Sequence, residues 1–333
     1  MPADYILSKP MHSFKALSGQ FNQRFDQRVF PDKPSGLYDP AQYILGLGGK
    51  RIRPVLCLMG NELFDEIRED AFDVAVAVEL FHNFTLIHDD IMDEAPLRRG
   101  EPTVHYKYGP HSALLAGDVM LVQAYEYLNR IKASYIHRIL QVFSRTAREV
   151  CEGQQLDMDY AALALSAVDM GDYRHMIALK TSVLLAASLQ MGGILGGGSE
   201  GNLDHLYAFG KNLGIAFQIQ DDYLDAFGDP EKFGKQPGGD ILVNKKTFLL
   251  LKAWEMGSPA VRKAILELME SETPEKVMRM LAIYHDCQVD RWAREEKMSY
   301  VYKANEHLEK VTVLSTRKKE LSELVDILLN RES

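Results

Sequence analysis

Residues 76–93 read VAVELFHNFTLIHDDIMD, an apolar helix pattern that ends in an Asp-Asp-x-x-Asp quintet, and they are the most informative part of this chain. A second stretch, LGIAFQIQDDYLD at residues 213–225, repeats the arrangement. Apolar residues cover most of the helical circumference in both stretches, which is typical of central helices. The first and last Asp of each quintet are four residues apart, so a helix places their carboxylates on one face. We therefore predict two buried helices that each end in an acidic face.

These carboxylates predict a metal site. An unpaired ion at the end of a buried helix costs on the order of several kcal/mol, and bound cations remove that cost. Carboxylate oxygens suit a hard cation such as Mg²⁺, which takes one or two carboxylates and completes its shell with water and phosphate oxygens. A solvated surface face is the alternative for a single quintet, but the apolar flanks disfavour it. The candidate ligands are Asp89, Asp93, Asp221, Asp222 and Asp225, and Asp90 is a further catalytic candidate.

The composition is that of an ordinary globular protein, with 333 residues, 46% of them hydrophobic and 26% charged. No Pro/Ser-rich linker or low-complexity tract divides the chain, so we predict a single domain over residues 1–333. The formal charge of −9 argues against a nucleic-acid partner, and an anionic substrate would need a local basic patch. Three widely spaced cysteines and an N-terminus without a signal-peptide pattern predict a cytoplasmic protein. The most apolar stretch, residues 182–198, is short and rich in glycine, which predicts a core helix and no membrane span.

Helical periodicity recurs along the whole chain, and no alternating strand pattern of useful length accompanies it. We therefore predict an all-α bundle with a cavity between its long central helices. The predicted helices lie near residues 12–28, 38–46, 54–65, 70–94, 111–131, 135–160, 172–194, 203–226, 245–254, 258–269, 273–304 and 306–330.

Basic residues occur close to both quintets, where a diphosphate would need them. The turn GGKRIRP, residues 48–54, opens a helix whose N–H groups and dipole favour a phosphate. Two adjacent arginines in the loop after the first quintet point in different directions and can bind two phosphates. The basic candidates are Lys50 and Arg53 in the turn, Arg98 and Arg99 in the loop, and Lys235 and Lys245 after the second quintet.

Neutral polar side chains share the acidic helix faces. His82 and Thr85 lie on the face of Asp89, and Gln218 lies one turn before the second quintet. A lone histidine on an apolar helix is usually a core residue, but the alignment of His82 with Asp89 favours a functional role.

These motifs resemble those of the trans-prenyltransferases, the head-to-tail isoprenyl diphosphate synthases. The matching elements run in the family's order over about residues 40–250, and their combination is specific. They are GGKRIRP, LIHDDIMDEAPLRRG, Gly117-Asp118, Gly153-Gln154-x-x-Asp157, Lys180-Thr181, FQIQDDYLD, and FGKQPGGDI followed by NKKT.

The resemblance implies an all-α homodimer and a division of labour among the candidates. Asp89, Asp93 and Asp222 or its neighbours would hold about three Mg²⁺ against an allylic diphosphate. Thr181 and Gln218 would turn oxygen dipoles toward the developing allylic cation. The allylic diphosphate would also contact Arg98, Lys180, Lys235 and Lys245, whereas isopentenyl diphosphate would contact Lys50, Arg53, His82 and Arg99.

The resemblance also predicts a short product. A growing chain would extend along the helix of Asp89, where Phe84 and Thr85 occupy the fifth and fourth preceding positions and Phe81 lies further back. Family members that stop at fifteen carbons often carry bulky aromatic residues at both nearer positions. Thr85 is small, so we predict twenty-carbon geranylgeranyl diphosphate, with fifteen- and twenty-five-carbon products as neighbours.

Three other interpretations of the sequence are possible. A class I terpene cyclase shares the first quintet but normally has an Asn/Asp-x-x-Ser/Thr-x-x-x-Glu pattern instead of the second. A non-catalytic subunit of a heteromeric synthase typically loses acidic residues, and this chain keeps both sets. A calcium-binding bundle is disfavoured, because the glycine-containing EF-hand loop is missing from the quintets.

Overall fold

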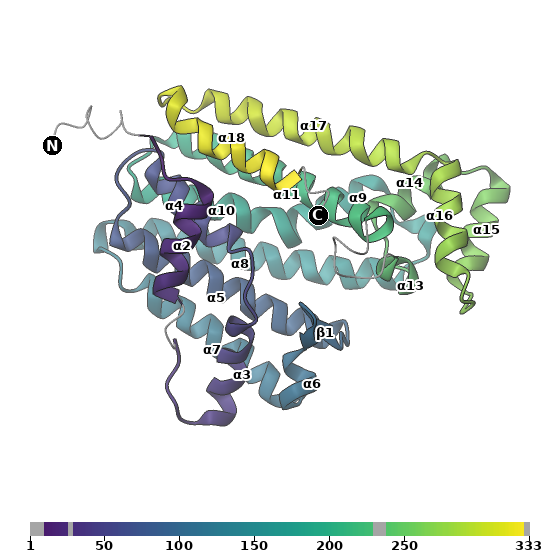
Figure 1. Cartoon of the computed structure of the whole chain (residues 1–333), viewed down its shortest axis with the longest axis horizontal. Helices are drawn as coiled ribbons and strands as arrows, with labels where there is room; N and C mark the ends of the chain where they lie inside the picture. The colour runs from purple at the N-terminus through teal and green to yellow at the C-terminus, as the bar shows by residue number, and fades with distance from the viewer. Residues whose placement is uncertain (1–9, 26–28, 229–237, 330–333) are drawn as a thin grey trace. The chain divides into compact units, whose positions relative to one another are not determined.

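The computed structural model describes residues 10–25, 29–228 and 238–329, and this part of the chain is almost entirely helical (Figure 1). The predicted all-α class is therefore confirmed. The strands of the described part form one short ribbon, in which β1 (Leu97–Arg98) pairs antiparallel with β2 (Glu101–Pro102). This ribbon follows the first quintet directly and carries Arg98.

The described residues form two compact units. Unit 1 contains the residues up to Ala147, with Leu184–Tyr207 and Lys310–Leu321, and unit 2 contains Arg148–Val183, Ala208–Glu309 and the residues from Ser322 on. The first quintet belongs to unit 1 and the second to unit 2. The single domain expected over residues 1–333 stays a prediction.

Unit 1 is built around α5 (Glu69–Met92), which is apolar around its circumference as the sequence predicts. The helix packs against α4 (Ile52–Glu62) and α7 (Pro110–Leu128). Its Phe81 ring lies in contact with Phe84 and with Phe143 of α8 (Ala133–Ala162), at centroid distances of 5.6 and 5.4 Å. The helices with residues in this unit are α2 (Phe14–Phe25), α3 (Ser35–Gly46), α4 (Ile52–Glu62), α5 (Glu69–Met92), α6 (Val104–Tyr108), α7 (Pro110–Leu128), α8 (Ala133–Ala162), α10 (Val183–Leu195), α11 (Glu200–Phe227) and α18 (Ser315–Leu329). Helices α8, α10, α11 and α18 also contribute residues to unit 2, and α17 (Val289–Lys310) contributes its last residue to unit 1.

Unit 2 adds further helices, some of which start at a capping residue. Asp169 accepts hydrogen bonds from the first turn of α9 and forms a capping box with Asp172, and Thr247 caps α14 through Leu250 N. The core of this unit includes Tyr173, Ile219 and Phe248. Its further elements are η1 (Leu165–Ala167), α9 (Met170–Ile177), the π-helix η2 (Ala178–Ser182), α13 (Gly239–Leu242), α14 (Phe248–Met256), α15 (Pro259–Met269), α16 (Lys276–Asp286) and α17 (Val289–Lys310).

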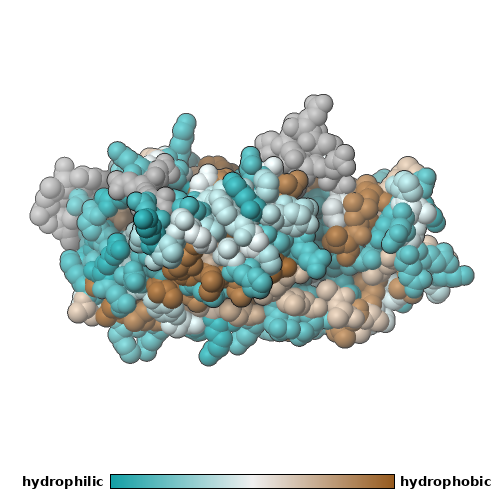
Figure 2. Space-filling view, turned by 90° about the horizontal axis from the view of Figure 1, so that it is seen from below, coloured by the Kyte–Doolittle hydropathy of each residue, from teal (hydrophilic) through white to brown (hydrophobic). Residues whose placement is uncertain are grey.

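One helical segment, Met170–Leu195, is long and apolar enough by length and composition to cross a membrane, and 78% of its most apolar window is buried inside the protein. That burial favours the packed core helix that the sequence predicts. Elsewhere, apolar side chains reach the surface in patches among hydrophilic ones (Figure 2). On α7, the side chains of Leu114, Leu115 and Val122 are 48%, 55% and 58% exposed.

Candidate active site

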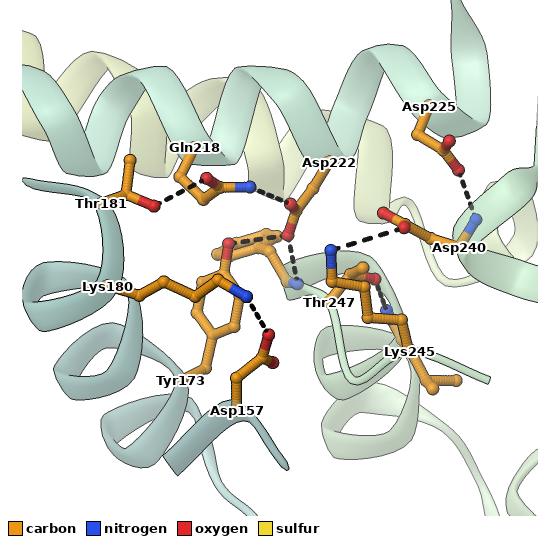
Figure 3. A network of polar contacts seen from close by, with 12 residues as sticks. Asp157, Tyr173, Lys180, Thr181, Gln218, Asp222, Asp225, Asp240, Lys245 and Thr247 are labelled. Carbon is orange, nitrogen blue, oxygen red and sulfur yellow. Dashed lines mark hydrogen bonds and ion pairs between the residues drawn. The ribbon is translucent and has the colours of Figure 1, made fainter. Parts of the chain in front are cut away.

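The second quintet lies at the end of α11 and directs its middle carboxylate into unit 2 (Figure 3). Asp222 is only 4% exposed, yet it accepts three hydrogen bonds. Tyr173 Oη and Phe248 N donate to its Oδ2 atom over 2.7 and 2.9 Å, and Gln218 Nε2 donates to its Oδ1 atom over 3.0 Å. Burial raises the pKa of Asp222 to about 6, although Lys245 and the hydrogen bonds act in the opposite direction. Asp222 therefore links α9, α11 and α14.

The other two carboxylates of this quintet have different surroundings. Asp221 is exposed to solvent. Asp225 accepts a hydrogen bond from Asp240 N over 3.0 Å, and its carbonyl oxygen accepts one from Gly238 N over 2.6 Å. Asp225 thus fixes the start of α13, the short helix that precedes Lys245.

A small cavity of about 60 Å³ opens beside Asp222. Its polar lining includes the ammonium groups of Lys180 and Lys245. Lys180 Nζ lies 2.6 Å from Asp157 Oδ2, and Lys245 Nζ lies 3.6 Å from Asp240 Oδ1. Burial lowers the pKa of Lys245, but the carboxylates of Asp240 and Asp222 outweigh it and raise the pKa. The remaining lining residues are Tyr173, Met176, Ile177, Thr181, Gln218, Lys246 and Thr247.

Polar groups along one side of this cavity form a chain. Thr181 Oγ1 donates to Gln218 Oε1 over 3.2 Å, and the amide nitrogen of Gln218 donates to Asp222 (Figure 3). Lys246 instead donates to Ala161 O at the end of α8, over 3.0 Å. The structure therefore brings together Lys180, Thr181, Gln218 and Asp222, which the sequence predicts to act at one site.

The first quintet shows a parallel arrangement in unit 1. Asp90, 2% exposed, accepts a bidentate pair from Arg98, with Nε at 2.8 Å from Oδ2 and Nη2 at 2.7 Å from Oδ1. Asp89 is partly buried and Asp93, which caps α5, is exposed. The middle Asp of each quintet is thus the buried one.

Arg99 turns away from Arg98 toward the glycine turn before α4. Its backbone is left-handed, with φ of 55°, and its guanidinium donates to Gly48 O. A Cβ atom at Gly49 would lie 3.0 Å from Arg99 Nη2, so glycine gives the guanidinium room beside the turn. The two arginines point in different directions, as the sequence predicts, and Lys50 is exposed in the same turn.

Arg53 and His82 meet below this turn, where Arg53 Nη1 lies 3.2 Å from His82 Nε2. Burial lowers the pKa of Arg53 to about 10 and, with Arg53 and Arg99 adding to the effect, holds the pKa of His82 well below its usual value. The carboxylate of Glu79 acts against this lowering of the Arg53 pKa, but Glu79 is itself paired with Arg51 over 2.5 Å. A neutral His82 can then accept a hydrogen bond from Arg53 Nη1, and the surroundings remain rich in positive charge.

The chain-length candidates lie further back on α5. The Phe84 ring packs against Phe81 and, at 4.7 Å, against His88, while Thr85 Oγ1 donates to His82 O over 2.8 Å. Thr85 is more exposed than Phe84. Their influence on product length stays a prediction.

The sequence reasoning missed several contacts. Asp157 belongs to the Gly153-Gln154-x-x-Asp157 motif, but its sequence context does not indicate a role, and only the structure shows that it binds Lys180. Tyr173 had no sequence signal, because its contact with Asp222 joins helices distant in the chain. Lys235 lies outside the described residues. Within residues 10–25, 29–228 and 238–329, no group of three or more His, Cys, Asp or Glu side chains is arranged to hold a metal ion, so the predicted ligand set stays a prediction.

The sequence and the structure of this chain are similar to those of known proteins. The sequence profile of the polyprenyl synthetases matches residues 34–287. The geranylgeranyl diphosphate synthase of Methanosarcina mazei is 35% identical, covering 98% of this chain and 99% of its own, and the geranylfarnesyl diphosphate synthase of Natronomonas pharaonis is 32% identical, covering 93% and 94%. A crystal structure of a geranylgeranyl pyrophosphate synthase superposes with a TM-score of 0.91 and 42% identity, covering 97% of this chain and all of that one. The resemblance found in the motifs is thereby confirmed over most of the chain.

Proposed function

This chain belongs to the polyprenyl synthetase family, and from that premise we propose that it condenses isopentenyl diphosphate head to tail with an allylic diphosphate. The proposed product is twenty-carbon geranylgeranyl diphosphate. The name of the Methanosarcina mazei relative and the small side chain of Thr85 support this length. The Natronomonas pharaonis relative is named a geranylfarnesyl diphosphate synthase, so a twenty-five-carbon product is the alternative to the twenty-carbon one.

One observation carries the proposal most directly, namely the surroundings of Arg53. Its Nε atom is buried and has no hydrogen-bond partner in the part of the chain that the structure describes. The Nη1 atom of Arg53 contacts His82, whose lowered pKa keeps it neutral, Arg99 adds further positive charge, and Glu79 is bound by Arg51. A buried donor without a partner is costly, and a bound anion removes that cost. We assign the diphosphate of isopentenyl diphosphate to this position, with Lys50 at its rim.

The allylic diphosphate is assigned to the unit 2 cavity. Lys180 and Lys245 present ammonium groups there, and preorganised cations of this kind stabilise charge that develops on a leaving diphosphate. Thr181 and Gln218 line the same cavity, and we propose that their oxygen atoms face the allylic cation there. The double bond of isopentenyl diphosphate attacks that cation, and the departed diphosphate takes the proton. This proton transfer requires no side-chain base.

Asp89, Asp93 and Asp221 are the carboxylates best suited to hold Mg²⁺, because they are the more exposed members of their quintets, whereas Asp90 and Asp222 are buried and hydrogen-bonded within the protein. Hard oxygen donors of this kind fit a cation that keeps waters and binds phosphate oxygens. Bound Mg²⁺ would neutralise negative charge on the diphosphate as the C–O bond breaks.

We further propose a cytoplasmic homodimer. The exposed side chains of Leu114, Leu115 and Val122 lie on one face of α7 and form an apolar stripe that a second copy would cover. Sedimentation of the wild type and of Leu115→Asp tests this, since the dimer predicts that only the variant shifts toward the monomer mass.

The decisive experiment incubates the pure protein with isopentenyl diphosphate, Mg²⁺ and allylic diphosphates of five, ten or fifteen carbons, and determines the chain length of the products. We expect twenty-carbon diphosphate as the main product. Release of a hydrocarbon from one allylic substrate would indicate a terpene cyclase instead. Absence of turnover with every primer would indicate a non-catalytic subunit and refute the proposal.

A further inference from the structure

Lys180 and Thr181 lie in an irregular turn. The π-helix η2, Ala178–Ser182, interrupts the long apolar segment, and Val183 N donates to Ala178 O across five residues. Such π-bulges often occur at functional sites, because the extra residue changes the direction of neighbouring side chains. In this structure the bulge carries two lining residues of the unit 2 cavity.

Helix α8 contacts the bulge from one side through a glycine. A Cβ atom at Gly153 would lie 2.2 Å from Lys180 N and 2.6 Å from Lys180 Cα, so any side chain there would displace the backbone of the bulge. One helical turn later, Asp157 Oδ2 lies 2.6 Å from Lys180 Nζ. A single turn of α8 therefore contacts both the backbone and the ammonium group of Lys180.

Helix α11 repeats this pattern from its own position in unit 2. A Cβ atom at Gly214 would lie 2.6 Å from Ser182 Cα. One turn later, Gln218 Oε1 accepts the hydrogen bond from Thr181 Oγ1 (Figure 3). Each helix thus uses a glycine to admit the backbone of the bulge and a polar residue four positions on to hold one of its side chains.

We propose that Gly153, Asp157 and Gly214 are positioning residues that fix Lys180 and Thr181 for the allylic diphosphate. The proposal rests on the proposed function. Gly153 and Gly214 set where the π-bulge lies between α8 and α11, and Asp157 sets where the ammonium group of Lys180 lies. Substitution at these positions moves the contact groups without removing them.

The test compares the full-length variants Gly153→Ala, Gly214→Ala and Asp157→Asn with two matched controls. Gly201→Ala also adds a methyl group to α11, at a position where a Cβ atom meets nothing within 4 Å. Asp159→Asn changes an exposed carboxylate of α8, two residues after Asp157. Each protein is assayed for its KM for allylic and for isopentenyl diphosphate, its kcat, its Tm and its binding of an allylic thiodiphosphate, which does not ionise.

Asp157→Asn should raise the allylic KM and the thiodiphosphate Kd by roughly tenfold, because a charge-assisted contact is lost. Gly153→Ala and Gly214→Ala should lower kcat by about 100-fold, the effect of a displacement of about 1 Å at a reacting site. The KM for isopentenyl diphosphate should change by less than about twofold, since that substrate is assigned to unit 1, and both controls should behave as the wild type.

A double-mutant cycle distinguishes positioning from general structural damage. In a Lys180→Ala background, Asp157→Asn should have no further effect on the allylic KM, because it acts through Lys180. Additive effects in that background, equal effects on both substrates, or similar effects of the controls would overturn the inference.

If a glycine variant does not fold, the near-isosteric Asp157→Asn alone decides the question. A wild type that neither turns over nor binds the thiodiphosphate refutes the proposed function and this inference together, whereas an active wild type with unaffected variants refutes this inference only.

Discussion

The hydroxyl of Tyr173 is a sensitive probe of the unit 2 site, because it is one of three donors to the buried carboxylate of Asp222. Tyr173→Phe removes this hydroxyl and keeps the aromatic ring, which packs at 6.2 Å from Phe248. Burial, and then the charge of Asp222, raises the pKa of Tyr173, so the tyrosine is a protonated donor at all working pH values. The substitution therefore deletes one hydrogen bond.

The cost of this deletion should depend on pH. A hydrogen bond to an ionised group contributes about 1.5–3 kcal/mol, and one between neutral groups about 0.5–1.5 kcal/mol. The folded-state pKa of Asp222, about 6, exceeds the ordinary value of 3.8, so the folded protein prefers the protonated carboxyl and loses stability as the pH rises between these values. The hydrogen bond from Tyr173 lowers this pKa, and its removal raises the pKa further.

We therefore expect Tyr173→Phe to lower the free energy of unfolding by about 2–3 kcal/mol at pH 8 and by about 1 kcal/mol at pH 5, where Asp222 is protonated. If the site needs the ionised form, the acid limb of the rate profile should move to higher pH by about one unit, because one pKa unit corresponds to about 1.4 kcal/mol.

Urea unfolding and steady-state rates between pH 5 and pH 9 measure both effects. Tyr160→Phe is the matched control, since Tyr160 is a partly buried tyrosine packed against the same core. A destabilisation that is equal at pH 5 and pH 8, together with an unmoved acid limb, would refute the view that Tyr173 stabilises the ionised carboxylate.

Three further predictions concern residues of unit 1. Asp89→Ala should lower turnover by several orders of magnitude without loss of helical circular dichroism, and chelation of Mg²⁺ should have the same effect, whereas near wild-type turnover at saturating substrate would contradict the metal assignment. Arg99→Ala should raise the KM for isopentenyl diphosphate by about ten- to 100-fold, while Arg98→Ala should impair use of the allylic substrate and also lower the Tm, since it leaves a buried carboxylate unpaired. Identical kinetic effects of the two would argue against this division. Product analysis by chromatography should show longer chains for Phe84→Ala and shorter chains for Thr85→Phe, and an unchanged distribution in both would mean that chain length is set elsewhere.

Local pattern was sufficient to predict much of this structure. The helices that carry the quintets, the glycine turn before Arg53 and the divergence of Arg98 and Arg99 follow from periodicity, from the requirements of helix starts and from the geometry of adjacent side chains. These features depend on residues that are neighbours in sequence, so they can be inferred without knowledge of packing.

Contacts between distant segments could not be predicted in the same way. The sequence does not indicate which Asp of a quintet is buried and which is exposed. Packing decides this, because the burial of Asp222 depends on where Tyr173 of α9 and Phe248 of α14 lie. The π-bulge could not be predicted from the apolar run 182–198 and the residues before it, since its position depends on contacts with Gly153 and Gly214 on other helices.

The two quintets share a physical logic that explains why each contains a middle carboxylate at all. Residues on an α-helix are rotated by about 100° from one another, so the first and fifth residues of a quintet lie on the same side of the second, displaced by about 100° and 60° from it. A second Asp bound inside the protein therefore fixes the rotation of the helix and directs the outer carboxylates to its flank. Arg98 binds Asp90 with a full charge, whereas neutral donors bind Asp222, whose pKa is raised by burial. The buried carboxylates thus serve to orient the exposed ones, which are the groups proposed to meet the metal ions and the diphosphate.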